Sequence, residues 1–333
     1  MKSKIKNKLN AELKQQIGRL ERDYSLNRLS PVLAKSIREF LLRKGKRLRP
    51  LLFVLGYLGF AKKEAPNLYR SALSFELLHG FFLVHDDIVD KSPTRRGKPA
   101  MHKILGEDLA LIAADLIYAL AMESFLSVKE NSRRKEKALR IFIRAAAHTA
   151  TGEFIELLSS SKDIGKIKKQ DISRIHDLKT ACYSFASPLS CGATLAGANQ
   201  KQTDLLYQYG IYLGRAFQLK DDILGLFGEE KKTGKPSLTD LEEAKKTLLS
   251  WYAYHNSRPK ERALIRKILN KNKVKRSDLL TMRRIMVSSG ALYYSAREIS
   301  RLTKEAQSVI ASCRMDKKYK AMLNNYSKEL LSL

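Results

Sequence analysis

Residues 73–90 read LSFELLHGFFLVHDDIVD, a stretch in which an apolar helix runs into three aspartates. The first part, Leu73–His85, is strongly apolar and predicts a helix with a buried face. Asp86 and Asp90 are four residues apart, so they are expected to lie on one face of that helix, with Asp87 beside them. Three carboxylates this close repel one another unless cations lie among them. The stretch therefore predicts a helix whose end carries a metal site.

Helical periodicity continues through the rest of the chain. The 333 residues include 17 glycines and 8 prolines, and apolar residues recur at helical spacing from end to end. No linker rich in proline or serine divides the chain, so we expect an all-α protein with a single helical domain over residues 1–333. The expected helices cover residues 8–25, 31–44, 49–61, 67–91, 107–128, 134–160, 171–198, 203–225, 239–255, 259–270, 276–287 and 290–330.

A second acidic cluster, DDILG at residues 221–225, lies at the end of another predicted helix. Asp221 and Asp222 are enough for one or two metal contacts, although an acidic helix end is often simply solvated. Basic residues and a Gly-Lys-Pro follow each cluster, at residues 97–99 and 234–236. Aspartates that hold Mg²⁺ beside lysines and arginines that hold phosphate oxygens suit a polyphosphate ligand.

Two further basic features fit such a ligand. Lys179 lies inside the apolar helix predicted over residues 174–197, where a lysine needs an anionic partner or a cavity. A phosphate would satisfy it, and the hydroxyl of Thr180 would then lie near the reacting centre. The segment GKRLRP, residues 45–50, places three cations in a turn, which taken alone reads as a basic loop between helices.

Other side chains leave two interpretations open. Glu153 and Glu156 are three residues apart and either face the metals through water or are ordinary surface acids. His79 lies two turns before Asp86 on the same helix, whereas the other histidines show no zinc spacing. Phe82 lies one turn, about 5.4 Å, before Asp86. Its ring would therefore form the floor of an apolar channel that descends from the metals.

Composition narrows the class of protein. The net charge of +29, from 63 basic and 34 acidic residues, is compatible with attraction to nucleic acids, anionic membranes or anionic substrates, or with a lysine-rich solvated surface. The charges are dispersed, and no RNA-recognition signature or zinc-finger spacing is present. Three cysteines, without a signal peptide or an apolar run long enough to cross a membrane, predict a reduced cytoplasmic protein.

From about residue 30 to 255 the chain resembles the polyprenyl synthetase family, the trans-prenyltransferases that make farnesyl and geranylgeranyl diphosphate. The motifs occur in family order: GKRLRP at residues 45–50, Asp86–Asp90 with Arg95-Arg96-Gly97, Lys179-Thr180, Phe217-Gln218 before Asp221-Asp222, Thr233–Pro236, and Asp240-Leu241 followed by KKTLL at residues 245–249. The resemblance implies a bundle of helices around a deep central cavity, usually dimeric, that uses two or three Mg²⁺ ions.

The resemblance also implies roles for individual residues. The metals would be held by Asp86, Asp90 and Asp221, supported by Asp87 and Asp222. The allylic diphosphate would be held by Arg95, Lys179 and Lys235, and isopentenyl diphosphate by Lys46, Arg49, His79 and Arg96. Thr180 and Gln218 would stabilise the allylic cation, and Lys245 would lie near the diphosphates.

Three positions depart from the family pattern. Gly225 replaces the last acid of the second motif, which is tolerable if Asp221 is the principal ligand. Glu153 and Glu156 stand where the family usually has Gln and Asp. The C-terminus lacks the basic tail that closes over substrate in some members.

The resemblance predicts a Mg²⁺-dependent enzyme that condenses isopentenyl diphosphate with an allylic diphosphate. The pair Phe81-Phe82 resembles the pattern of farnesyl-forming members, so a C15 product is favoured, with C20 second. A terpene cyclase would not need Lys46 and Arg49, and a non-catalytic subunit of a heteromeric prenyltransferase typically loses the first acidic motif, which is complete here. We expect a homodimer that binds no nucleic acid, and contact with a membrane surface stays open.

Overall fold

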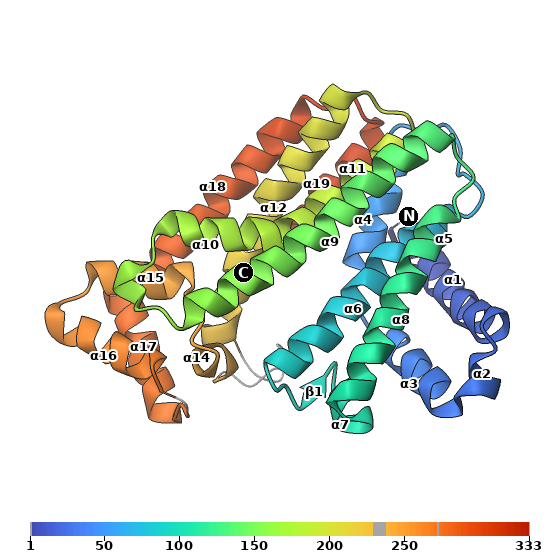
Figure 1. Cartoon of the computed structure of the whole chain (residues 1–333). Coiled ribbons are helices and arrows are strands. Elements are labelled where there is room, and N and C mark those ends of the chain that lie inside the picture. Colours follow the sequence, from blue (N-terminus) through green and yellow to red (C-terminus); the bar gives the residue numbers. More distant parts are fainter. Residues whose placement is uncertain (1, 229–237, 272, 333) are drawn as a thin grey trace. The chain divides into compact units, whose positions relative to one another are not determined.

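The computed structural model describes residues 2–228, 238–271 and 273–332. These residues fold into helices with one small hairpin, which confirms the expected all-α class (Figure 1). The first elements are α1 (Lys2–Asp23), α2 (Leu26–Leu29), α3 (Pro31–Leu41), α4 (Leu48–Leu58), α5 (Leu68–Ala72), α6 (Ser74–Val89), the strands β1 (Thr94–Arg95) and β2 (Lys98–Pro99), α7 (Met101–Leu105) and α8 (Glu107–Leu126).

Helices of varied length make up most of the remaining chain. They are α9 (Ser132–Ser160), the 3₁₀ turn η1 (Ile164–Lys166), α10 (Lys169–Ile175), the π-helix η2 (His176–Ala186), α11 (Ser187–Leu195), α12 (Gln200–Phe227), α14 (Thr239–Glu242), α15 (Leu248–Asn256), α16 (Pro259–Leu269), α17 (Arg276–Ser288), α18 (Ala291–Ala311) and α19 (Lys317–Leu331).

The chain divides into two compact units, each assembled from three separate stretches. Unit 1 consists of Met1–Phe142, Pro188–Thr203 and Met315–Met322, and unit 2 consists of Ile143–Ser187, Asp204–Arg314 and Leu323–Leu333. Each unit has its own core and carries its own share of the predicted site residues. The expectation of a single domain stays a prediction.

Aromatic rings form the centre of unit 1. Phe75 of α6 lies edge-on to Phe142, with ring centroids 4.9 Å apart, and Phe125 of α8 lies 5.0 Å from the same ring. Phe53 of α4 completes the cluster at 5.9 Å from Phe75. All four side chains are fully buried, so the first half of α6 is fixed by hydrophobic packing against its neighbours. The acidic end of the same helix is therefore held in place by the core.

One described helix, α8, is long and apolar enough to cross a membrane by length and composition alone. It packs along α6 through small residues, of which Ala110, Ala113, Ala114 and Ala121 are fully buried. The opposite side of α8 exposes apolar side chains, among them Leu109 and Ile112. Half of this apolar helix therefore belongs to the core of unit 1.

In unit 2, the helices η2 and α12 approach each other closely through glycine. A Cβ atom at Gly210 or Gly214 would overlap the backbone of Ala186 or Ala181 on η2. Only a residue without a side chain allows two backbones to come this near. This contact brings Thr180 on η2 beside Gln218 on α12.

The predicted helices differ from the observed ones mainly where the chain lacks glycine or proline. The segment predicted as one helix over residues 290–330 is divided between α18 and α19. At the break, the backbone N–H of Asp316 donates to the carbonyl of Gly59, 2.8 Å away, and its side chain accepts from the N–H of Lys318. A contact with a distant segment ends the helix here, and local sequence carries no signal for it.

Candidate active site

The first acidic cluster forms the C-terminal end of α6 in unit 1. Asp86 and Asp90 are both half-buried, and the N–H of Asp90 donates to the carbonyl of Asp86 at 2.8 Å, which closes the last helical turn. Asp87 is fully buried. The predicted common face of Asp86 and Asp90 is therefore present, and Asp87 faces the interior of the unit.

Asp87 has a partner that the sequence did not indicate. Its Oδ1 accepts a hydrogen bond from Arg95 Nε at 2.7 Å and a second from Arg95 Nη2. Burial lowers the pKa of Arg95, but the bond to Asp87 and the charges of Asp86 and Asp90 outweigh it, so the pKa is raised. Arg95 is thus a fixed cation directly beside the acidic cluster.

The two arginines after the cluster lie on a tight hairpin. Arg95 of β1 pairs with Lys98 of β2, and the two-residue loop between them is Arg96-Gly97. Both loop residues have positive φ, 55° and 73°, which is typical of a type I′ hairpin turn. The left-handed conformation is unfavourable for an arginine, so Arg96 must be held by its surroundings.

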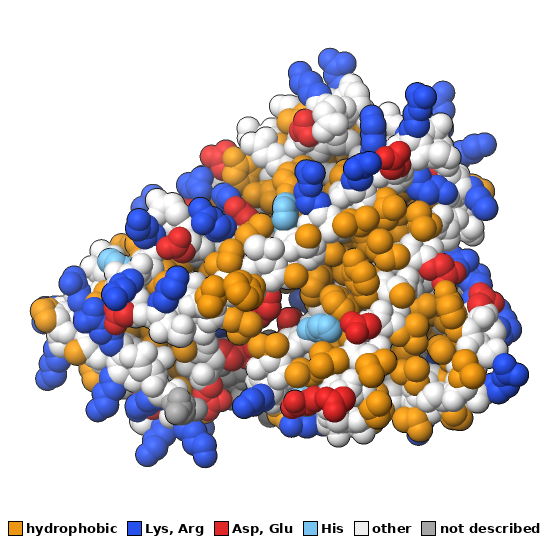
Figure 2. Space-filling model, viewed as in Figure 1, with side chains coloured by type: hydrophobic (Ala, Val, Ile, Leu, Met, Phe, Trp, Pro, Cys, Tyr) orange, Lys and Arg blue, Asp and Glu red, His pale blue; other side chains and the backbone are white. Residues whose placement is uncertain are grey.

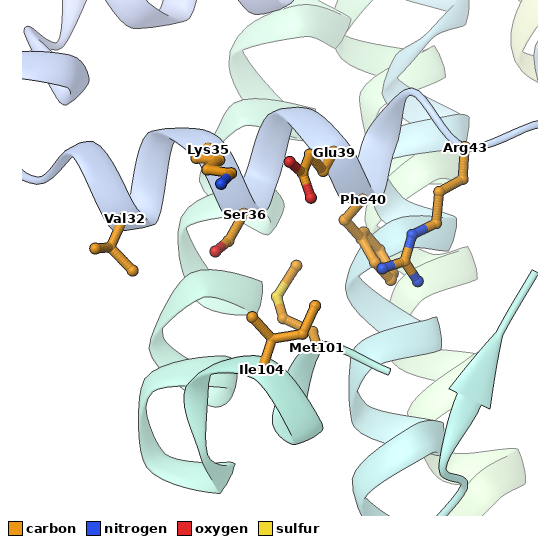
Figure 3. Close-up of a pocket in the computed structure, with 8 residues that line it drawn as sticks. All are labelled: Val32, Lys35, Ser36, Glu39, Phe40, Arg43, Met101 and Ile104. Atoms are coloured by element: carbon orange, nitrogen blue, oxygen red, sulfur yellow. The ribbon is translucent and has the colours of Figure 1, made fainter. Parts of the chain in front are cut away.

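Arg43, which follows α3, connects this hairpin to the rest of unit 1 by hydrogen bonds. Its guanidinium donates to the carbonyl of Arg95 at 3.1 Å and to the carbonyl of Pro99 at 2.9 Å. The same side chain borders a pocket of about 260 Å³ between α3 and α7 (Figure 3). The pocket is lined by Val32, Lys35, Ser36, Glu39, Phe40, Arg43, Met101 and Ile104. It contains none of the predicted ligand-binding residues.

Glu76 is a buried carboxylate among arginines. It accepts from Arg47 Nη1 and lies 3.6 Å from Arg96 Nη2. Arg47, itself buried and at a φ of 51°, also donates to the carbonyl of Arg43 at 3.0 Å. Burial lowers the pKa of Arg96, and the neighbouring arginines lower it further. One negative charge thus supports a dense positive group, which is a surface suited to an anion.

The remaining residues predicted to bind isopentenyl diphosphate lie near this positive group. Burial, together with Arg49, Arg96 and other arginines, lowers the pKa of His79 well below its ordinary value. His79 is therefore neutral at physiological pH and can donate or accept a hydrogen bond. Arg49 is half-buried and Lys46 is exposed.

The two phenylalanines before the acidic cluster differ in burial. Phe82 is buried, whereas Phe81 is half-buried and packs 4.4 Å from His85 and 5.1 Å from Tyr118 of α8, measured between ring centroids. The two rings are 5.1 Å apart in an edge-on arrangement. They form an aromatic group one turn before Asp86.

In unit 2, Lys179 lies between two glutamates. Glu153 and Glu156, on one face of α9, each form an ion pair with its ammonium group. Burial raises the pKa of Glu156, but the charges of Lys179 and Lys245 outweigh that effect, and the pKa is below its ordinary value. Both carboxylates are mostly covered and paired with Lys179, and their proposed position facing the metals stays a prediction.

A chain of hydrogen bonds links the predicted cation-stabilising residues. Thr180 donates to Gln218 Oε1 at 2.7 Å, and Gln218 Nε2 donates to Asp222 Oδ1 at 2.9 Å. His176 Nε2 lies 3.4 Å from the other oxygen of Asp222. Asp222 is buried and Asp221 is exposed, so this pair repeats the division between an inward and an outward acid seen at Asp86 and Asp87.

The lysines after the second cluster have different environments. Lys245 pairs with Glu243 at 2.5 Å. Lys246 is buried and donates to the carbonyls of Ser160 and Ala244, so it has a structural role. Lys235 lies outside the described residues.

The acidic side chains fit a hard cation that is shared with a ligand. Mg²⁺ prefers oxygen ligands and usually takes one or two carboxylates, with waters and phosphate oxygens as the rest. Asp86 and Asp90 supply two such carboxylates, and the buried Oδ2 of Asp87 accepts no hydrogen bond from the described residues. Over those same residues, no three acids, histidines or cysteines converge as a cage made by protein alone. The residues fit a cation whose coordination a phosphate ligand would complete.

The sequence alone did not identify several residues that shape this site. Arg43 and Glu76 were missed, and the ion pairs of Glu153 and Glu156 with Lys179 were not foreseen. A lone glutamate in the apolar helix before the aspartates was the available signal for Glu76, because a buried acid needs a cationic partner. No comparable signal marks Arg43 within a basic segment.

Comparison with known proteins gives the same family throughout. A family model described as polyprenyl synthetase matches residues 30–286. A short chain isoprenyl diphosphate synthase of Methanocaldococcus jannaschii is 32% identical over 269 residues, which cover 80% of this chain and 77% of the relative. A geranylgeranyl diphosphate synthase of Sulfolobus acidocaldarius is 35% identical over 239 residues, 71% of each chain.

Solved structures resemble the chain over nearly its whole length. A geranylgeranyl pyrophosphate synthase from Corynebacterium glutamicum, complexed with isoprenyl diphosphate and magnesium, superimposes with a TM-score of 0.91. It is 25% identical, and the match covers 99% of this chain and 98% of that one. The likeness therefore includes both acidic clusters.

The buried position of Glu76 generates a stability prediction. Glu76→Gln leaves Arg47 and Arg96 without their compensating charge, so we expect a loss of about 3 kcal/mol in the free energy of unfolding. The matched control is Glu136→Gln, which breaks an exposed ion pair with Arg140 and should cost less than about 0.5 kcal/mol. Urea denaturation followed by circular dichroism measures both. Equal, small losses would show that Glu76 does not support the arginines.

Proposed function

The chain belongs to the polyprenyl synthetase family and is a short-chain trans-prenyl diphosphate synthase. We propose that it joins isopentenyl diphosphate to an allylic diphosphate in a Mg²⁺-dependent reaction. The observation that carries this proposal is the end of α6, where two half-buried aspartates lie beside the fixed guanidinium of Arg95. Carboxylates for metal and a cation for phosphate oxygens are both required to bind a metal-bridged diphosphate.

Ionisation of the allylic substrate is the step that the acidic and basic residues would assist. Asp86, Asp90 and Asp221 would hold Mg²⁺, which would supply Lewis-acid polarisation of the diphosphate oxygens. Arg95 and Lys179 would hold the leaving diphosphate by direct charge-assisted hydrogen bonds. Lys179 must exchange at least one glutamate partner for phosphate, and Glu153 and Glu156 would keep it oriented until then. Groups fixed before the reaction lower the barrier because they need no reorganisation.

The allylic carbocation needs partial negative charge and protection from water. Gln218 and Thr180 are oriented by the hydrogen bonds that end at Asp222, so their oxygens form a fixed polar group. Dipoles held in this way stabilise the developing positive charge. The double bond of isopentenyl diphosphate would then attack, and a proton would leave to the released pyrophosphate.

Isopentenyl diphosphate would bind at the positive group of unit 1. Lys46, Arg49 and Arg96 supply cations, and neutral His79 supplies a hydrogen bond. Glu76 and Arg43 would hold this group together in the absence of substrate. A non-catalytic subunit is disfavoured because both the first acidic motif and these cations are intact.

We propose C15 as the main product, with C20 as the second candidate. Phe81 and Phe82 lie one turn before Asp86, and Phe82 is buried. An aromatic group in this position would limit the length of a chain that grows away from the metals. The volume of these rings, rather than their polarity, would set the limit.

Replacing a proposed metal ligand tests the chemistry. Asp86→Asn keeps the shape of the side chain and removes its charge, so we expect turnover to fall by roughly a hundredfold or more. The measurement is incorporation of isopentenyl diphosphate with each allylic primer. Asp108→Asn, at an exposed acid of α8, is the control and should retain its rate. A near-normal rate for Asp86→Asn, with thermal unfolding unchanged, would remove the metal assignment.

Product length tests the aromatic group. Replacing both Phe81 and Phe82 with Ala should shift the main product by one or more isoprene units, because the growing chain gains space. Mass spectrometry of the dephosphorylated products gives the length. Phe60→Ala, a half-buried phenylalanine after α4, is the control. Unchanged products from an active double variant would refute the limit.

We also propose that the enzyme is a homodimer, with α8 in the interface. The outer side of α8 presents apolar residues at helical spacing, with Leu109 57% and Ile112 62% exposed and Leu116 and Ala119 continuing the row. Hydrophobic side chains gather over this helix in Figure 2. The exposed Asp115 lies beside this row, but the row itself is apolar. An apolar row of this kind is typical of a self-complementary contact.

Sedimentation tests the dimer. The wild type should sediment with twice the chain mass of 37.9 kDa, and Leu109→Gln/Ile112→Gln should shift it towards the monomer. The control is Leu280→Gln/Val287→Gln, which removes two equally exposed apolar side chains from α17. A monomeric wild type, or equal effects of both variants, would contradict this interface.

A further inference from the structure

Residues 258–287 of unit 2, which contain α16 and α17, carry a strong excess of positive charge and lie outside the proposed site. Eleven lysines and arginines face two acids over these thirty residues, a net charge of 11 − 2 = +9. Figure 2 shows basic side chains gathered over α16 and α17. This group is separate from the cations assigned to diphosphate binding.

The two acids in this segment are used within the fold. A side-chain oxygen of Glu261 accepts from the backbone N–H of Arg258 at 3.2 Å, at the start of α16. Asp278 accepts from the backbone N–H of Lys275 at 2.9 Å and from Lys271 Nζ at 2.6 Å. Both carboxylates therefore cap helices, and little negative charge remains to compensate the outer surface.

The outer face of α17 alternates basic and apolar side chains. Arg276, Leu280, Arg284 and Val287 are all exposed, and their spacing of four, four and three residues places them on one side of the helix. Leu280 is 56% and Val287 is 58% exposed. Leu279, Met282, Ile285 and Met286 fill the opposite, buried side. The helix is thus apolar on its inner face and cationic with apolar residues on its outer face.

The neighbouring Arg283 differs from Arg276 and Arg284 in the direction of its side chain. Arg283 turns inward, where its Nε donates to the carbonyl of Leu226 at 2.5 Å and its guanidinium lies 6.0 Å from the ring of Phe227. Arg276 and Arg284 make no ion pair with the described residues. Both arginines are exposed, so their charges lie at the surface of the unit.

We propose that the outer face of α17, with the adjacent basic residues of α16, is a docking surface for a bilayer that contains anionic lipids. Arg276 and Arg284 would lie at the headgroup phosphates, and Leu280 and Val287 would enter the interfacial layer between them. A bilayer accepts charge and apolar surface together on a flat face. A nucleic acid would use the arginines but would leave the two apolar side chains in water.

The inference does not rest on the proposed reaction, because it uses none of the residues assigned to substrate. Docking to a bilayer would nevertheless affect the product of that reaction, because a prenyl diphosphate is itself an anionic amphiphile. An enzyme held at a bilayer would release such a product beside the phase into which its chain partitions.

Co-sedimentation with vesicles tests the surface. The full-length protein should bind vesicles of phosphatidylcholine mixed with phosphatidylglycerol and should bind pure phosphatidylcholine much less. Arg276→Gln/Arg284→Gln should weaken binding to the anionic vesicles by roughly twenty-five-fold, at about fivefold for each arginine. Leu280→Gln/Val287→Gln should also weaken it, although the charge is unchanged.

The control removes the same number of charges elsewhere. Arg133→Gln/Lys137→Gln takes two exposed cations from α9 and should leave vesicle binding within about twofold of the wild type. Prenyl transfer in solution should be unchanged in all three variants, which separates docking from catalysis. Three results would overturn the inference: no binding to anionic vesicles at low salt, equal losses in the control, or binding to duplex DNA that resists the Leu280/Val287 substitutions and exceeds binding to vesicles.

Discussion

The positive group of unit 1 depends on compensation of charge inside the protein. Several arginines near His79 would repel one another if only water surrounded them, and burial would make the repulsion stronger. The carboxylate of Glu76 offsets it from within the core, while Asp87 does the same for Arg95. Glu76, Asp87 and Arg47 are buried. The side chains of Arg95 and Arg96 are partly exposed. The protein thereby holds a charged site assembled before the ligand binds.

Unit 2 also compensates charge within the protein, but there two acids surround one cation. There a single lysine, Lys179, lies between Glu153 and Glu156, and the acids are the more numerous partner. The charges of two nearby lysines keep Glu156 ionised despite its burial. A ligand that brings both negative charge and cations would suit this arrangement, because the metal would attract the acids as the phosphate attracts the lysine. Under the proposed function, both units would bind the same kind of ligand, for different electrostatic reasons.

The sequence predicted the helical class, the common face of Asp86 and Asp90, and the buried lysine at residue 179, because each follows from local spacing and polarity. It did not predict which acid of each pair turns inward, since that depends on the packing of neighbouring helices. The break between α18 and α19 was missed for the same reason: the carbonyl of Gly59, far away in the chain, fixes it. Arg43 was missed because the sequence of a basic segment does not distinguish its buried arginines, Arg43 and Arg47, from exposed cations such as Lys46.

The π-helix η2 limits the insertions and deletions that this part of the chain can accept. Eleven residues, His176–Ala186, follow a wider spiral than the α-helices on either side, with each turn holding more residues than an α-turn. A deletion of one residue would tighten the spiral and rotate the following side chains by about 100°. Lys179 and Thr180 could not then both keep the partners that they have on α9 and α12. We therefore expect this stretch to tolerate an exchange of side chains more readily than a change of its length.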